Sequence, residues 1–110
     1  MATSTTAPAA ARIAKAVAAA ERAVRASEMF RDAPKGLEAL SFHLGAVLYQ
    51  GEAAGPLQWA ANYAGAQAEL HLPAFSNPFL TEAQLEAERM NRLRRLQGIV
   101  FGALVVSLSE

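Results

Sequence analysis

The chain is expected to fold as an all-α protein, a single-domain four-helix bundle (residues 1–110) whose C-terminal helix is long. Three observations predict this fold. Hydrophobic residues make up 53% of the 110 residues, and alanine, which has the highest helix propensity, is the most frequent of them. Proline and glycine divide the chain near positions 34–36, 51–56 and 73–78, where they favour turns. Between these breaks the larger apolar residues recur at helical spacing.

The first predicted helix begins near Thr6 or Ala7, behind a polar tail at residues 1–6, and ends near Arg31. The second is expected over Leu37–Gln50. Phe42 and Tyr49 are seven residues apart in it, away from the stripe that is expected to face the core. That core stripe consists of Leu37, Leu40, Leu44, Val47 and Leu48. The second helix should therefore make contacts on two sides.

A flexible turn at Gly51–Gly55 should lead into a third helix over Pro56–Leu72. Trp59 and Tyr63 lie on one face of it, and alanines on the opposite face allow another helix to approach closely. In the connection that follows, Phe75 and Phe79 are expected to plug the end of the bundle. The fourth helix should begin at Thr81, because Thr81 and Gln84 fit a capping box.

The end of the fourth helix, Gly98–Leu108, has no polar side. A helix that is apolar all round must be enclosed by protein or by lipid, yet this run is about half as long as a membrane-spanning helix. Gly98 and Gly102 match Gly-x-x-x-Gly, which permits close helix pairing; the alternative is that they relieve crowding within the bundle. We expect contacts with a partner protein at Gly98, Val100, Phe101, Gly102, Leu104, Val105, Phe42, Tyr49, Trp59 and Tyr63.

A basic cluster, Arg89, Arg92, Arg94 and Arg95, precedes this run. Three interpretations are open: a solvated helix face paired with Glu86 and Glu88, a contact with lipid headgroups, or a contact with nucleic-acid phosphates. The formal net charge of the chain is zero, which argues against a broad nucleic-acid-binding surface.

The chemistry-bearing residues form no recognisable catalytic, cofactor or metal site. The sequence has no cysteine, so that disulfides and thiolate ligands are excluded. Its two histidines, His43 and His71, do not occur in a Glu-x-x-His motif of the kind that di-iron bundles use. Neither Gly-x-Ser-x-Gly nor a glycine-rich phosphate loop is present. We therefore expect no enzyme, no cofactor and no small-molecule substrate.

These observations predict a non-enzymatic structural or assembly protein. It would be a helical homo-oligomer or a small accessory subunit of a larger complex, with membrane association left open; the alternative is a small dimeric nucleic-acid-binding regulator. The N-terminal segment has Arg12 and Lys15 but no acid before Glu21, as in organellar transit peptides, and it lacks the apolar core of a secretory signal. The protein is thus expected to be intracellular, with an organelle or a membrane surface left open, and not secreted.

Overall fold

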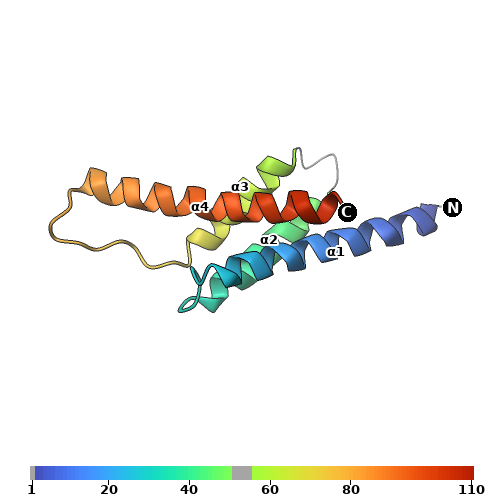
Figure 1. Cartoon of the computed structure of the whole chain (residues 1–110), viewed down its shortest axis with the longest axis horizontal. Coiled ribbons are helices and arrows are strands. Elements are labelled where there is room, and N and C mark those ends of the chain that lie inside the picture. The colour runs from blue at the N-terminus through green and yellow to red at the C-terminus, as the bar shows by residue number, and fades with distance from the viewer. Residues whose placement is uncertain (1, 51–55) are drawn as a thin grey trace.

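The computed structural model describes residues 2–50 and 56–110, although not the side chains of residues 2–8, and confirms an all-α bundle-like fold. The described part contains four helices, α1 (Ala2–Ala26), α2 (Pro34–Leu48), α3 (Leu57–Glu69) and α4 (Glu82–Leu108). Each helix packs on the next, and α4 returns to pack on α1 (Figure 1). This ring order surrounds one core. The turn expected at Gly51–Gly55 lies outside the described residues.

The core is narrow because alanine supplies much of it. α1 contributes Ala16, Ala20 and Val24, and α3 contributes only alanines among its buried apolar residues. The predicted stripe of α2 is confirmed, since Leu37, Leu40, Leu44 and Val47 are buried and Leu48 packs against them. Small side chains on α1 and α3 allow the helix axes to approach closely, and the larger side chains of α2 and α4 fill the space between them.

The two halves of α4 differ in their surroundings. Leu96, Val100 and Leu104 in the C-terminal half are fully buried. The N-terminal half and the connection before it extend beyond the other three helices (Figure 1), which contributes to the elongated shape of 62 × 25 × 20 Å. The predicted capping box starts this half, with Thr81 and Gln84 bonded reciprocally. Local bonds of this kind stabilise a helix segment that has little tertiary packing.

Several predicted boundaries are corrected. α1 begins at Ala2 rather than near Thr6, so residues 2–6 of the expected polar tail are helical; Met1 lies outside the described residues. α1 also ends at Ala26, short of Arg31. The Ser27 hydroxyl donates to the Val24 carbonyl and accepts from the Met29 amide at 3.2 Å, and such local bonds compete with helix continuation.

The turn between α1 and α2 is closed by an aromatic side chain. Glu28 has a left-handed backbone, with φ of 61°, which reverses the chain direction after α1. Phe30 is only 2% exposed and lies against Gly36 of α2. A Cβ atom at Gly36 would be 2.2 Å from the Phe30 ring. The glycine is therefore required for the ring to pack here. Pro34, expected in the turn, is the first residue of α2.

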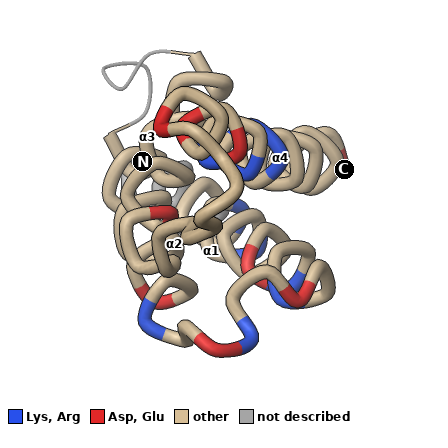
Figure 2. Tube along the Cα trace, turned by 90° about the vertical axis from the view of Figure 1, so that its left-hand side faces the viewer, with Lys and Arg blue, Asp and Glu red and all other residues tan. Residues whose placement is uncertain are grey.

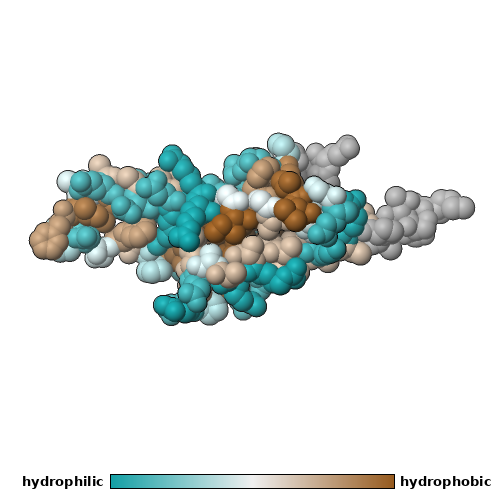
Figure 3. Space-filling model, viewed as in Figure 1, coloured by the Kyte–Doolittle hydropathy of each residue, from teal (hydrophilic) through white to brown (hydrophobic). Residues whose placement is uncertain are grey.

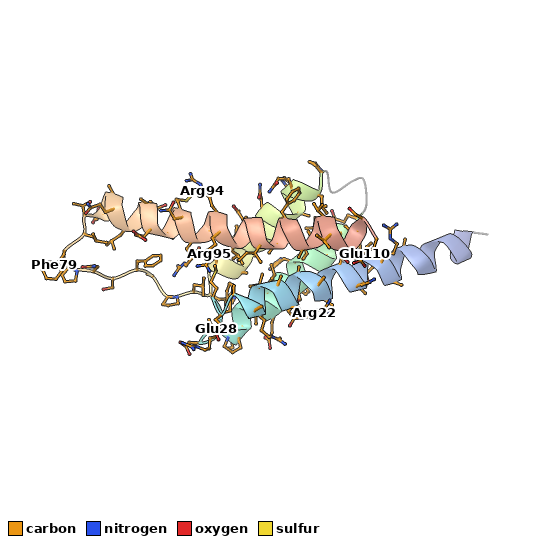
Figure 4. The ribbon with its side chains drawn as sticks, in the orientation of Figure 1. Arg22, Glu28, Phe79, Arg94, Arg95 and Glu110 are labelled. Carbon is orange, nitrogen blue, oxygen red and sulfur yellow. The ribbon has the colours of Figure 1, made fainter. Side chains whose placement is uncertain are left out.

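The expected plug at the end of the bundle is not formed by Phe79, which is 91% exposed at the tip of the α3–α4 connection (Figure 4). Asn77 folds this tip as a turn, because its side-chain carbonyl accepts from the Phe79 amide at 2.9 Å. Phe75 is half-exposed and lies beneath an arginine of α4. The tip therefore projects into solvent.

Candidate functional site

The C-terminal half of α4 carries an exposed face opposite its buried side. We call it the α4 outer face; its members follow helical spacing and are all exposed: Asn91, Arg94, Arg95, Gly98, Gly102, Val105, Val106 and Ser109. Val106 is 66% exposed and Val105 is 37% exposed. In Figure 3 hydrophobic residues gather over this half of α4, bordered by hydrophilic ones. The monomer therefore buries only one side of the apolar run.

The two glycines of the outer face have no packing role within the monomer. A Cβ atom built on Gly98 or on Gly102 would meet no atom within 4 Å among the described residues. Gly65 differs, because a Cβ there would lie 2.8 Å from Cγ of Gln97. Crowding thus explains Gly65, where α3 crosses α4, but not Gly98 or Gly102. The idea that these two glycines relieve crowding inside the bundle is wrong.

A groove runs beside the outer face, between α1 and α4. It has a volume of about 490 Å³, with Ala19 and Ala23 on one wall and both outer-face glycines on the other. Ser107 also lines it. This residue is 9% exposed, and its Oγ atom has no hydrogen-bond partner among the described residues. The groove thus combines small apolar residues with the charged side chains of Lys15, Arg22 and Glu110 at its rim.

Charged residues close one end of this groove. Lys15 of α1 bonds to Glu110 at 2.8 Å, and Arg12 donates to the Leu108 carbonyl at 2.6 Å. The Lys15 ammonium lowers the pKa of Glu110 below its ordinary value, chiefly through this hydrogen bond. These contacts link the end of α4 to α1.

A second exposed surface, the aromatic row, joins α2 to α3. The Trp59 and Tyr63 rings stack with centroids 5.3 Å apart and an interplanar angle of 3°. The Tyr63 ring meets His43 edge-on at 5.6 Å, and His43 meets Phe42 edge-on at 5.1 Å. Phe42 is 71% exposed. Two predicted contact regions therefore form one surface, with His43 as a member that the sequence analysis missed.

Tyr49 is separated from this row. Its hydroxyl donates to the Ala10 carbonyl of α1 at 3.3 Å, so the ring connects α2 to α1 although it is 57% exposed. The face predicted from the seven-residue spacing of Phe42 and Tyr49 is thus divided in function. The Phe42 ring belongs to the aromatic row between α2 and α3, whereas the Tyr49 ring connects α2 to α1.

The four arginines of the basic cluster also have different surroundings, because Glu69 lies beneath two of them. Glu69 is only 4% exposed and accepts from Arg92 at 2.8 Å and from Arg89 at 3.4 Å. Arg92 also donates to the Pro73 carbonyl at 2.9 Å and stacks over Phe75, 4.4 Å from its centroid. Arg92 is therefore a structural link between α4 and the α3–α4 connection, which sequence spacing could not reveal.

Arg89 bonds to Glu86 as well, at 2.7 Å, and lowers the pKa of that carboxyl. Arg94 and Arg95 project from the two edges of the α4 outer face (Figure 4). In Figure 2 acidic and basic residues are interspersed along α4 and around the turn after α1. Arg89 pairs with Glu86, as one interpretation of the cluster expects, whereas Arg92 pairs with the buried Glu69 instead of Glu86 or Glu88. Arg94 and Arg95 lie exposed on the outer face.

Other predicted contact residues belong to the interior. Val100 and Leu104 are fully buried, which corrects the expectation that they contact a partner, because every fourth residue of α4 here faces the core. Phe101 is partly buried and packs against the core. Gly98, Gly102 and Val105 remain available on the outer face.

Comparison with protein-family models, with curated proteins and with solved structures finds no match. Across residues 2–50 and 56–110, no group of three or more His, Asp or Glu side chains is arranged to hold a metal ion. None of the helices in the described chain is sufficiently long and apolar to cross a membrane.

Proposed function

We propose that the protein is a non-enzymatic assembly protein that associates with another protein chain through the α4 outer face. The observation that carries this proposal is the exposed apolar surface at Val105, Val106 and the adjacent glycines. Contiguous exposed apolar surface is typical of interaction sites. The same segment is buried on its opposite side, so the face is presented by a rigid helix.

Gly98 and Gly102 lower the stability of the α4 helix, and packing within the monomer does not offset this loss. Glycine in the middle of a helix is less favourable than alanine by about 1 kcal/mol, and Gly98 and Gly102 both lie within α4. Since neither has a neighbour that a methyl group would touch, their advantage must come from outside the monomer. Close approach of another helix is the contact for which small residues at this spacing are suited.

The alternative, a nucleic-acid-binding regulator, receives less support from the arrangement of charge. Phosphate contacts depend on Lys and Arg side chains that are free to approach the backbone. Arg92 and Arg89 are instead directed to Glu69. Arg94 and Arg95 stay exposed, but they project from the two edges of the α4 outer face and do not form one stripe.

The proposal is tested by measuring the mass of the protein in solution by analytical ultracentrifugation, over a range of concentrations and with and without detergent. We expect a concentration-dependent increase in mass that Val106→Arg abolishes. Leu70→Arg is the matched control, because Leu70 is 73% exposed at the end of α3 and lies outside the outer face. A monomer at every concentration would overturn association between copies and leave a different protein chain as the partner of this face. Association only in detergent would assign the face to lipid and overturn the proposal.

A further inference from the structure

We infer that the α4 outer face binds the same face of a second copy, with the two α4 helices antiparallel and crossing between Gly98 and Gly102. This inference rests on the proposed function and specifies its partner. On the outer face of each copy, Gly98 and Gly102 lie between the arginines at positions 94 and 95 and the valines at positions 105 and 106. When two such faces meet antiparallel, the glycines oppose each other and the arginines of one copy oppose the valines of the other, as a two-fold symmetric interface requires.

Charge selects the antiparallel arrangement. In a parallel pair Arg94 and Arg95 would each lie against their own copies, and like charges in contact are unfavourable. In an antiparallel pair centred between the glycines, position 95 faces position 105 and position 91 faces position 109. The arginines of one copy then extend over Val105 and Val106 of the other, toward Glu110, which follows that helix and has one carboxylate oxygen bonded to Lys15 of its own chain. Their aliphatic stems cover the valines while the guanidinium groups approach the carboxylate.

The groove beside the outer face contributes to the same interface. Ala19 and Ala23 on its α1 wall are small enough to let the second α4 settle against both helices. The hydroxyl of Ser107, which has no hydrogen-bond partner among the described residues, is buried on the α4 wall of the groove. Packing within one copy leaves the space beside the two glycines unfilled.

The size of the contact predicts its strength. The outer face and the α1 wall together supply roughly a dozen residues from each copy, whereas a stable interface of standard size uses about 20–30 a side. The dimer should therefore be weak and in equilibrium with monomer. Measurements must span concentrations from dilute solution to about 1 mM, the region where contacts of this size associate.

Cysteine crosslinking tests the register directly, because the natural chain contains no cysteine. Asn91→Cys and Ser109→Cys each place one thiol on the outer face. In the antiparallel pair position 91 lies opposite position 109 of the other copy, while identical positions are about 27 Å apart along the helix at 1.5 Å per residue. A thiol crosslinker that spans about 10 Å, roughly one interhelical distance, should join only unlike positions.

The expected result is a covalent dimer when the two variants are mixed, and little or none when either variant is treated alone. Crosslinking of Ser109→Cys with itself would show a parallel pair and overturn the antiparallel register. A dimer by mass without any crosslink would place the contact on another face, which overturns this inference but leaves self-association intact. A monomer by mass at all concentrations would overturn both. An Ala46→Cys variant, exposed on α2, controls for random collision.

Discussion

Replacing Gly98 and Gly102 with alanine should strengthen the fold and weaken the assembly. Both positions lie inside α4, and a methyl group at either would meet open space. Each substitution gains the helix propensity that separates alanine from glycine, about 1 kcal/mol. The free energy of unfolding of the double variant should therefore be about 2 kcal/mol higher. This increase raises the melting temperature by roughly 8 °C for a domain of this size.

The same methyl groups obstruct the proposed crossing. In a symmetric dimer four of them would enter a contact whose close approach depends on their absence, and overpacking typically costs 1–3 kcal/mol. We expect the dissociation constant of the dimer to increase about ten-fold or more, which corresponds to about 1.4 kcal/mol. Melting is to be recorded in dilute solution, where the protein is monomeric, and association by sedimentation at high concentration.

Gly45→Ala provides the matched control. Gly45 lies within the last turn of α2, where a Cβ atom would also meet nothing within 4 Å, so this variant should gain stability without any change in association. If alanine at Gly98 and Gly102 lowers the melting temperature, the glycines have a role in the monomer that open space does not reveal. If it raises the melting temperature and leaves the dimer intact, the outer face is not the interface.

Three further outcomes follow from individual contacts. Glu69→Gln should reduce the free energy of unfolding by about 3 kcal/mol in urea titrations, because a buried ion pair that loses one partner leaves an uncompensated charge; an unchanged midpoint would refute the role of this carboxylate. Gly36→Ala should cost about 1–3 kcal/mol through overpacking against Phe30, and Phe30→Leu should recover part of that loss if the ring is the cause. The pKa of Glu110, followed by NMR, should lie below its ordinary value and return toward it in Lys15→Ala. Since the folded-state pKa is lowered, this contact adds stability above about pH 4.3 that is lost as pH falls through the folded-state pKa.

The fold class could be predicted because helix propensity, the spacing of apolar residues and the turn residues all indicate packed helices. The stripe of α2 and the cap at Thr81 are local signals, and both are confirmed. Local rules failed where a tertiary contact decided the outcome. The sequence predicts a turn at Gly36, but the role of this glycine is to admit the Phe30 ring, which depends on how α1 and α2 pack.

The candidate site was predictable only in part. Periodicity indicated that Gly98–Leu108 needed enclosure on all sides, and it could not say which residues the bundle itself would cover. The structure assigns Val100 and Leu104 to the core and leaves Gly102 and Val106 outside. Glu69 was missed because a single acid in an alanine-rich helix has no sequence signal of burial. Its arginines lie 20 and 23 residues away.

The packing of α4 on α1 also determines when the protein can finish folding. Arg12 bonds to the carbonyl of Leu108, 96 residues later in the chain, and the buried alanines of α1 lie in the core that α4 completes. Domains fold as units while the chain is synthesised from its N-terminus. Here α1, α2 and α3 emerge first with an uncovered apolar side, and the bundle closes only after the last turns of α4 have been made. A nascent chain stalled before that point would display that apolar side to chaperones.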